Sequence, residues 1–200
     1  MAVKLPVMEA FYTIQGEGKN TGKAAYFIRL AGCDVGCSWC DVKESWPAAA
    51  HPELSVEQLV SDACSFPARN VVITGGEPLM YNLGPLTTAL KAAGFYIMLE
   101  TSGAYPLSGI FDWICVSPKK FKLPLDTLLQ VADELKVIVF NQNDLIWGPA
   151  FTPFLKAGSF KFMQPEWSRE TKMTPIIVDF VKNNPEWQIS LQTHKYMQIP

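Results

Sequence analysis

The sequence predicts an α/β fold, a partial and open TIM-like (β/α)6 barrel, and three observations support this prediction. Short β-type apolar runs alternate with helical ones along the chain. Unusual polar or glycine-rich loops follow four successive strand candidates, and parallel strands bring such loops to one rim. The chain has 200 residues, whereas a complete eight-fold barrel takes about 250. We therefore expect a single domain over residues 1–200 with roughly six strands.

Seven runs have the composition and length of strands. In chain order they are residues 24–30, 70–74, 95–100, 113–116, 135–140, 160–163 and 187–191. A first helical pattern follows Ser55, a suitable N-cap three residues before Gln58, as in a capping box. Its apolar positions are Val56, Leu59, Val60 and Ala63. A second pattern of the same period runs through Met173, Ile176, Ile177, Phe180 and Val181.

The charge balance excludes several classes of partner. Lys and Arg number 17 against 19 Asp and Glu, a formal net charge of -2, which gives no basic footprint for a phosphate backbone or an anionic lipid. No apolar run reaches the roughly 18 residues that span a bilayer, and residues 1–9 lack the pattern of a signal peptide. We expect a cytoplasmic protein with no nucleic-acid or membrane partner.

The five cysteines form one cluster and two isolated positions. An odd count without a secretion signal disfavours a disulfide framework and favours metal or redox chemistry. Cys33, Cys37 and Cys40 lie within eight residues, directly after the first strand candidate. Cys64 and Cys115 continue apolar faces of a helix and a strand, so we interpret them as small core residues.

The cysteine loop predicts a thiolate cage. Structural zinc takes four closed ligands, and a fourth is missing near this loop. An iron-sulfur cubane held by three thiolates leaves one iron open to bind a substrate. Three buried thiols or a zinc knuckle is the simpler alternative. The loops at residues 75–78 and 117–119 would each be an ordinary turn if they stood alone. Together with residues 101–103 they follow the next three strand candidates, and this shared position favours a site on one rim.

The C-x3-C-x2-C loop, with Trp39 just before its last cysteine, resembles the signature of the radical S-adenosylmethionine (SAM) superfamily. The resemblance implies a 4Fe-4S cluster whose open iron chelates the methionine moiety of SAM. Reduction of the cluster then cleaves SAM and releases a 5′-deoxyadenosyl radical. The segment Gly75-Gly76-Glu77-Pro78 is similar to the superfamily motif that contacts the SAM amino group.

Within this superfamily the chain resembles the 7-carboxy-7-deazaguanine synthases over nearly its whole length. The motifs that carry the resemblance are residues 14–18, 29–33, 100–103, 117–119 and 192–195. It implies conversion of 6-carboxy-5,6,7,8-tetrahydropterin to 7-carboxy-7-deazaguanine with loss of ammonia, in 7-deazapurine and queuosine biosynthesis, with SAM reused. An external electron donor such as flavodoxin and a homodimer are implied as partners.

The resemblance also assigns site residues, with no catalytic residue beyond the cluster and SAM. Residues 31–42 form the cluster loop, and residues 192–200 form a tail that closes the substrate pocket. The implied cluster ligands are Cys33, Cys37 and Cys40. The residues implied to face SAM are Trp39, Cys40, Asp41, Gly76, Ser117, Pro118 and Lys119. The implied substrate contacts are Ile14, Gln15, Gly16, Glu17, Arg29, Thr74, His194 and Pro200.

The chemistry of these residue types agrees with the implied substrate. A carboxylated pterin needs a fixed cation and a few amide or acid groups, and Arg29 offers a bidentate fork. If the strand face that it shares with Phe27 points outward, Arg29 is a solvated surface residue. Gln15 and Glu17 are compatible with a solvated turn, and a single His near a terminus usually has no function.

One position departs from the family pattern. Many members carry Thr or Ser two residues after the last cysteine, and its hydroxyl contributes to a Mg²⁺ that touches the substrate carboxylate. Here the residue is Val42, which offers at most its backbone carbonyl. We expect any Mg²⁺ to be held mainly by substrate and water, with a weaker dependence on the metal than in a Thr-bearing relative.

Two other functions remain open at this stage. A glycyl-radical-enzyme activase has the same cysteine spacing and acts on a protein backbone, and it has no need of Arg29 or of the loop at residues 15–17. A non-catalytic iron-sulfur or zinc module predicts four protein ligands and no SAM binding.

Overall fold

The computed structural model describes residues 3–200 and arranges them round a nine-stranded sheet of order β3-β1-β2-β4-β5-β6-β7-β8-β9. The strands are β1 (Lys4–Ile14), β2 (Ala24–Leu30), β3 (Glu53–Ser55), β4 (Asn70–Gly75), β5 (Tyr96–Thr101), β6 (Trp113–Val116), β7 (Glu134–Val139), β8 (Phe160–Pro165) and β9 (Gln188–Ile189). Strands β2 and β4 to β9 run parallel. The six longer ones form the predicted open barrel.

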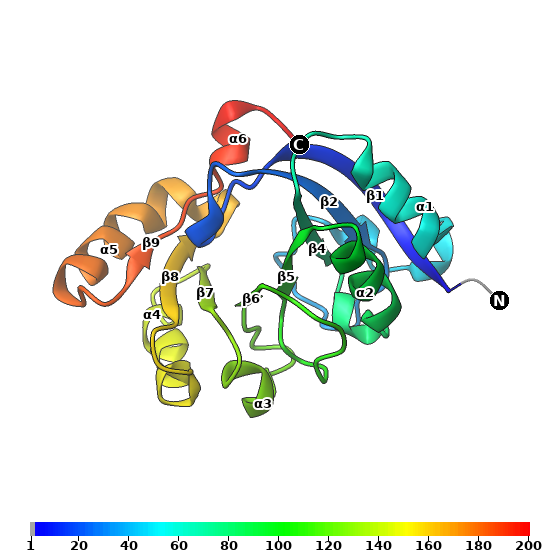
Figure 1. Cartoon of the computed structure of the whole chain (residues 1–200). Helices are drawn as coiled ribbons and strands as arrows, with labels where there is room; N and C mark the ends of the chain where they lie inside the picture. Colours follow the sequence, from blue (N-terminus) through cyan, green and yellow to red (C-terminus); the bar gives the residue numbers. More distant parts are fainter. Residues whose placement is uncertain (1–2) are drawn as a thin grey trace.

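Five helices cover the outer face of the curved sheet (Figure 1). They are α1 (Val56–Cys64), α2 (Gly84–Ala92), α3 (Asp126–Leu129), α4 (Asp144–Trp147) and α5 (Glu170–Asn183). A further short helix, α6 (Thr193–Met197), lies apart from them near the C-terminus. The main core lies between α1 to α5 and the outward side chains of the strands, and it includes Leu59 and Ile177 from the helices and Ile73 and Met163 from the strands. Ser55 caps α1 as predicted, because its side chain accepts a hydrogen bond from Gln58 N at 3.2 Å.

The inner face of the sheet changes from apolar to polar toward the rim. Phe27, Val72, Met98 and Trp113 are neighbours in the strand register and form an apolar floor. Two residues further along the strands, the inward positions are Arg29, Thr74, Glu100 and Cys115. The barrel interior therefore holds a polar layer over an apolar one.

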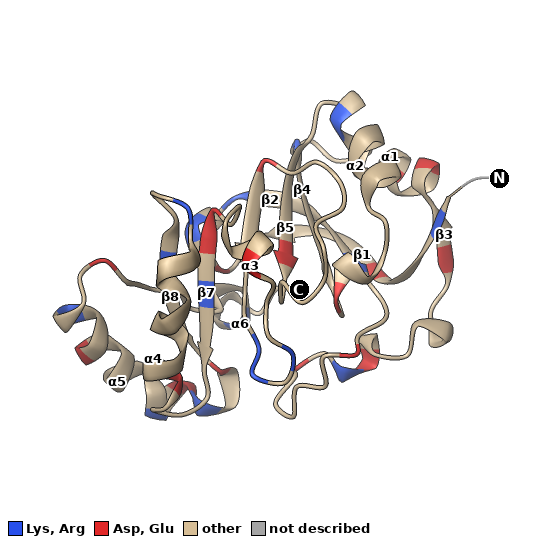
Figure 2. Cartoon of the chain, turned by 90° about the horizontal axis from the view of Figure 1, so that it is seen from below, with Lys and Arg blue, Asp and Glu red and all other residues tan. Residues whose placement is uncertain are grey.

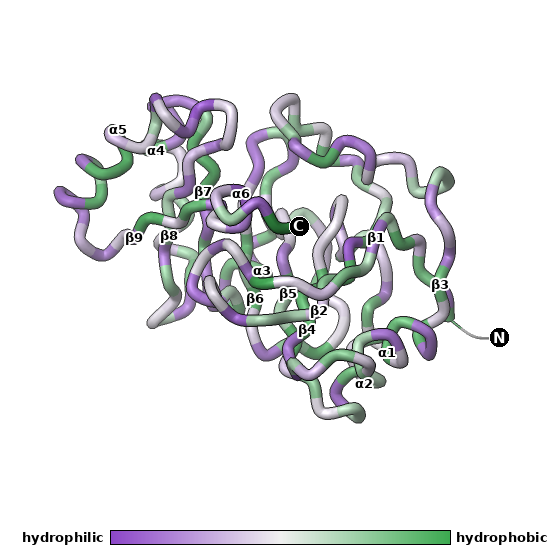
Figure 3. The backbone as a smooth tube through the Cα atoms, turned by 90° about the horizontal axis from the view of Figure 1, so that it is seen from above, coloured by the Kyte–Doolittle hydropathy of each residue, from purple (hydrophilic) through white to green (hydrophobic). Residues whose placement is uncertain are grey.

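Two segments close the open side of the barrel. The connection after β1 includes a short 3-10 helix, Gly18–Asn20, and it meets the C-terminal residues. Gly18 N donates to Ser190 Oγ at 2.9 Å, and Thr193 N donates to the Gly16 carbonyl at 3.0 Å. Seen from above, α6 and the end of the chain lie over the middle of the molecule, between β7 and β1 (Figure 3).

Strands β1 and β3 were not predicted. Strand β1 pairs antiparallel with β2 and β3, so it extends the edge of the parallel barrel. Its pairing is interrupted by a bulge between Val7 and Glu9, and it contains Pro6, which weakens the local signal for a strand. At the other edge, β9 is shorter than the predicted strand over 187–191.

The prediction that Cys64 is a core residue was wrong, because its side chain is exposed at the last residue of α1. The buried stripe of that helix is Val56, Leu59 and Ala63, and Cys64 lies about 100° further round it. Cys115 is buried, but its thiol faces the polar layer and lies 3.6 Å from Glu134 Oε1. None of the helices described is both long enough and apolar enough to cross a membrane.

Candidate active site

Four loops at the C-terminal ends of parallel strands surround one pocket, as the sequence predicts. The loops follow β2, β4, β5 and β6. We call this the cysteine pocket, because Cys33, Cys37 and Cys40 line it. Predicted residues that also line it are Glu17, Arg29, Trp39, Asp41, Thr74, Gly76, Ser117 and Lys119. Pro118 is buried and is the one predicted SAM-facing residue outside this lining.

The three clustered thiols fit an iron-sulfur cluster. Cys37 is buried and the other two are half-buried, all facing one cavity. Burial is the main cause that raises the pKa of the Cys33 and Cys37 thiols, to about 11 for Cys37, and the neighbouring thiols add to it. Iron must therefore displace protons when it binds. Within residues 3–200, no three Cys, His, Asp or Glu side chains are arranged to hold a single metal ion.

Gly76 allows the loop after β4 to lie directly against the cluster loop. A Cβ atom at this position would come 2.2 Å from the Gly32 carbonyl oxygen and 2.8 Å from Cys33 Cβ. Backbone hydrogen bonds hold the two loops together, from Gly76 N to the Leu30 oxygen and from Glu77 N to the Gly32 oxygen, both at 2.9 Å. The backbone at Gly76 can thus approach a ligand bound over the cysteines.

Sequence reasoning missed the part played by Glu77. Its buried carboxylate accepts hydrogen bonds from Thr101 Oγ1 at 2.6 Å, from Ser102 N at 2.8 Å and from Leu79 N at 3.0 Å. The loops after β4 and β5 are therefore joined by one acidic side chain. The sequence offered one signal for this contact. Glu77 lies between two glycines and a proline, and a Thr-Ser pair comes at the end of the next strand.

Lys119 packs over the cluster loop from the far side of the pocket. Its Nζ donates to the Ser117 carbonyl at 2.8 Å and to Ser117 Oγ at 2.6 Å, and it lies 5.6 Å from the centre of the Trp39 ring. Burial lowers the pKa of Lys119. These contacts bring together three of the residues implied to face SAM.

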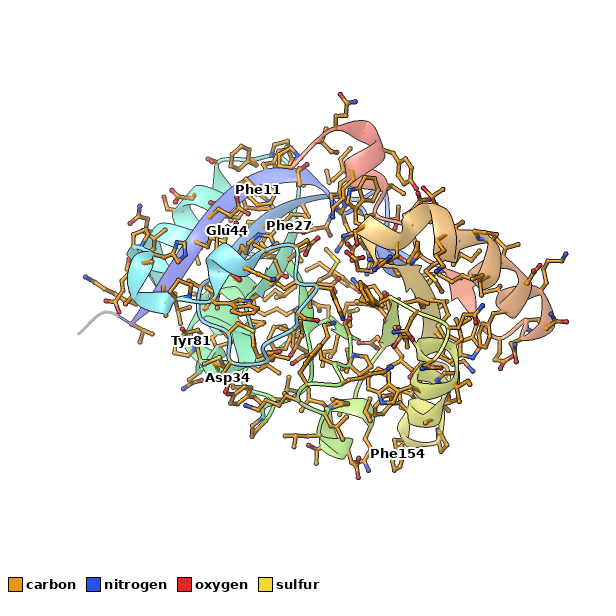
Figure 4. All side chains as sticks on the ribbon, turned by 180° about the vertical axis from the view of Figure 1, so that it is seen from behind. Phe11, Phe27, Asp34, Glu44, Tyr81 and Phe154 are labelled. Atoms are coloured by element: carbon orange, nitrogen blue, oxygen red, sulfur yellow. The ribbon has the colours of Figure 1, made fainter. Side chains whose placement is uncertain are left out.

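A second pocket adjoins the first, and we call it the tail pocket. Phe11 and Phe27 stack at 5.4 Å on β1 and β2 and form part of its wall (Figure 4). Of the implied substrate contacts, Ile14, Gln15, Gly16, His194 and Pro200 line the tail pocket alone. The residues that line both pockets are Glu17, Arg29, Asp41, Val42, Thr74, Glu100 and Gln192. A ligand in one pocket would thus share a wall with a ligand in the other.

The C-terminal tail is docked on the connection after β1, as expected. A Cβ atom at Gly16 would come 2.3 Å from His194 Nδ1, so this close approach requires glycine. Thr13 Oγ1 donates to the Pro200 carbonyl at 3.1 Å. Burial lowers the pKa of His194, which keeps its imidazole neutral at neutral pH.

Arg29 points into the barrel, as a contact with the substrate requires. Its Nε donates to Glu9 Oε1 at 2.6 Å, while none of residues 3–200 accepts a hydrogen bond from its two terminal nitrogens. Arg29 lines both pockets, so these nitrogens are available to a ligand carboxylate.

A charge network forms part of the wall shared by the two pockets. Strand β7 carries an acidic and a basic residue, drawn red and blue in Figure 2, and the basic one is Lys136. Its Nζ donates to Glu17 Oε2 at 2.5 Å and to Glu100 Oε2 at 2.9 Å. Burial favours the neutral amine, but the two carboxylates outweigh it and raise the pKa of Lys136 well above its usual value. Burial pushes the pKa of Glu17 up, and Lys136 overcomes this and lowers it to about 2.

Comparisons with known proteins agree with this site. A model of the radical SAM superfamily matches residues 27–128. A 7-carboxy-7-deazaguanine synthase from Flavobacterium psychrophilum is 54% identical over 98% of this chain and 93% of its own length. One from Synechocystis is 46% identical over 100% of this chain and 95% of its own. The crystal structure of QueE from Escherichia coli is similar, with a TM-score of 0.83 and 32% identity, over 94% of this chain and 93% of that one.

The chain belongs to the 7-carboxy-7-deazaguanine synthase family. Membership of the radical SAM superfamily implies a 4Fe-4S cluster and SAM. Membership of the synthase family makes the chain a radical SAM enzyme of the lyase class in queuosine biosynthesis. The relatives favour this function over a glycyl-radical-enzyme activase or a non-catalytic iron-sulfur or zinc module. The three thiols and the adjoining glycine loop are a set of groups that fits both cofactors.

In this family member, Glu134 is a second buried carboxyl group on β7. Its Oε2 accepts hydrogen bonds from Lys19 N at 3.1 Å and from Trp113 Nε1 at 3.2 Å. Burial is the main cause that raises the pKa of Glu134 from 4.5 to about 7, and Lys136 opposes part of that rise. Between these two pH values the folded protein holds a proton that the unfolded chain has lost, so this group lowers stability as the pH rises through 7.

We therefore expect Glu134→Gln to gain thermal stability relative to the unchanged protein as the pH increases. The difference in Tm should shift in favour of the variant by roughly 5 °C between pH 5 and pH 8. Melting curves followed by circular dichroism at four pH values measure it, with the exposed Glu186→Gln as the matched control. A Tm difference that is the same at all four pH values would contradict the assignment.

Proposed function

We propose that the chain converts 6-carboxy-5,6,7,8-tetrahydropterin to 7-carboxy-7-deazaguanine and ammonia. The observation that carries the proposal is the pair of adjoining pockets, one lined by three thiols and the other by Arg29 with its unused terminal nitrogens. The names of the relatives support the product. Substrate and products balance with loss of one ammonia and no net oxidation, so SAM is regenerated in each cycle.

The cysteine pocket is proposed to hold the cofactors. Cys33, Cys37 and Cys40 would bind the cluster. The SAM contacts would come from the backbone at Gly76, from Trp39 and Asp41, and from residues 117–119. When bound, the cluster and SAM supply the radical chemistry that removes a hydrogen atom from C6 of the substrate. The hydrogen bonds between the loops after β4 and β2 fix the rim on which both groups would lie.

The tail pocket is proposed to hold the substrate. Arg29 would bind the carboxylate, and the acid and amide groups of Gln15, Glu17 and Glu100 would bind the N–H groups of the pyrimidine edge. Lys136 donates a hydrogen bond to Glu17 and to Glu100, and an ionised carboxylate such as that of Glu17 accepts hydrogen bonds but cannot donate them. Thr74, Gly16 and the docked tail, with His194 and Pro200, would exclude water from the substrate.

An external donor such as flavodoxin would reduce the cluster. The chain would act as a homodimer in the cytoplasm, with residues 1–200 as one radical SAM domain. These points rest on the resemblance to the family, and residues 3–200 share one sheet, as a single domain requires.

An assay of product formation tests the proposal. The protein is reconstituted anaerobically with iron and sulfide, and SAM and dithionite are added with and without 6-carboxy-5,6,7,8-tetrahydropterin. We expect 7-carboxy-7-deazaguanine and one equivalent of ammonia only with the carboxypterin, and no requirement for a protein substrate. Cleavage of SAM without conversion of the carboxypterin would overturn the proposal.

Arg29→Lys separates binding of the substrate from cleavage of SAM. The lysine ammonium is a point charge and lacks the planar, two-pronged geometry with which a guanidinium binds a carboxylate. We therefore expect kcat/KM for the carboxypterin to fall by roughly 100-fold, a loss of about 3 kcal/mol of transition-state stabilisation. Reductive SAM cleavage without substrate should change less than twofold. Equal loss of both activities would assign Arg29 to SAM or to the fold.

A further inference from the structure

The position two residues after Cys40 does not fit a divalent cation. Val42 has no side-chain oxygen, so its carbonyl is the one ligand that it could offer. That oxygen already accepts two hydrogen bonds, from Ser45 N at 3.1 Å and from Ser45 Oγ at 2.7 Å. A carbonyl oxygen has two lone pairs, and both are used. Mg²⁺ demands oxygen ligands in near-octahedral geometry, and Val42 has none to give.

The carboxylate of Asp41, the residue before Val42, forms an ion pair with a lysine side chain. Asp41 Oδ2 accepts a hydrogen bond from Lys195 Nζ at 2.8 Å. Lys195 lies on α6, in the tail, and it lines the tail pocket together with Arg29, Asp41 and Val42. A positive charge from the tail therefore stands beside the position where the family pattern provides a metal ligand.

The ammonium of Lys195 has hydrogen-bonding capacity left. It has three N–H donors, and over residues 3–200 it donates to Asp41 alone. Its Nζ also lies 5.1 Å from the centre of the Trp167 ring, which holds the side chain over the rim. Two donors thus remain for a ligand. Arg29 lines the same pocket, and no described residue accepts a hydrogen bond from its two terminal nitrogens.

We propose that Lys195, positioned by Asp41, binds the substrate carboxylate opposite Arg29 and takes the place of a divalent cation. This inference rests on the proposed function, because it requires a carboxylated pterin in the tail pocket. An ammonium carries its charge on a flexible stem and needs no set of oxygen ligands. Thr193 N donates to the Gly16 carbonyl and so docks the tail in the position from which Lys195 lines the pocket.

A binding measurement tests the proposal without turnover. The ligands are 6-carboxypterin and pterin, two unreactive analogues that differ by the carboxylate alone. Their Kd values are measured by equilibrium dialysis on the reconstituted holoenzyme with SAM, in EDTA and in excess MgCl2. Variants Lys195→Gln, Val42→Thr and Lys172→Gln are compared with the unchanged protein. Lys172 is exposed on α5 and serves as the matched control.

We expect the unchanged protein to bind 6-carboxypterin equally in EDTA and in MgCl2. Lys195→Gln should weaken the binding of 6-carboxypterin by roughly tenfold, the loss of one charge-assisted contact, and change that of pterin less than twofold. Lys172→Gln should change neither. Val42→Thr should gain a response to Mg²⁺, because it restores a hydroxyl beside the carboxylate.

Three outcomes would overturn the inference. If Lys195→Gln lost affinity equally for 6-carboxypterin and for pterin, Lys195 would serve to hold the tail in place and not to bind the carboxylate. If the unchanged protein bound 6-carboxypterin only with Mg²⁺, or if Lys195→Gln bound it with full affinity, a cation other than Lys195 would bind the carboxylate. If the unchanged protein bound 6-carboxypterin no better than pterin, the proposed function itself would fail, which separates the two failures.

Discussion

Replacing any one of Cys33, Cys37 and Cys40 by alanine is expected to abolish the cluster and all turnover. The three thiols line one pocket on one loop, and a cubane with one open iron has no spare protein ligand. Activity should fall by at least about 1000-fold, which corresponds to about 4 kcal/mol of barrier. Iron and sulfide content after anaerobic reconstitution, together with visible absorbance, measures the loss directly.

The two remaining cysteines provide the controls for this experiment. Cys64→Ala should keep full iron content and activity, because the side chain is exposed at the end of α1. Cys115→Ala should also keep the cluster, since this thiol is buried beside Glu134 in the barrel interior. If Cys64→Ala lost as much iron as Cys37→Ala, the assignment of three ligands and one open iron would be wrong.

The parallel strands could be predicted from the sequence because each has its own local signal. Strands β2 and β6 match the predicted ranges residue by residue, since both are short apolar runs that end at a loop of unusual composition. The same logic located the rim, because loops that follow parallel strands share one edge of a sheet. Strand β1 lacks such a signal, and its pairing depends on β2 and β3.

The interior charges could not be predicted, because they depend on register. Glu17 and Lys136 are 119 residues apart, and only the closure of the barrel brings them within 2.5 Å. The sequence marked Glu17 through the family resemblance and gave no reason to mark Lys136 or Glu134. Each of these two occupies an inward position on β7, and which face of a strand points inward follows from its neighbours in the sheet.

Lys136→Met is expected to have the largest effect on stability. The ammonium is 4% exposed and donates to two half-buried carboxylates, which methionine would leave without their cation. Breaking such a buried pair costs about 3–5 kcal/mol. For a chain of 200 residues this corresponds to a fall in Tm of roughly 10 °C at pH 7. We expect kcat/KM to fall by at least about 100-fold, because Glu17 and Glu100 line both pockets.

The pH dependence identifies the cause of this loss. In the unchanged protein the pKa of Glu17 is lowered to about 2, so its contribution to stability is complete above pH 4.5 and is lost only as the pH falls from there toward 2. Without Lys136 the effect of burial on Glu17 is no longer opposed by that cation, so this carboxylate should bind a proton more readily than in the unfolded chain. The difference in Tm between Lys136→Met and the unchanged protein should therefore be smaller at pH 5 than at pH 8.

A second substitution completes the test. Lys136→Met combined with Glu100→Gln removes one of the two unpaired charges, so its Tm at pH 7 should lie above that of Lys136→Met alone. Lys182→Met, at an exposed position on α5, controls for the change of residue type and should melt like the unchanged protein. If the difference in Tm between Lys136→Met and the unchanged protein stayed the same from pH 5 to pH 8, and the double variant gained nothing, lost packing would account for the effect. The positions of Glu17 and Glu100 in the shared wall would then follow from the sheet register alone, and the charge of Lys136 would not be needed to hold them there.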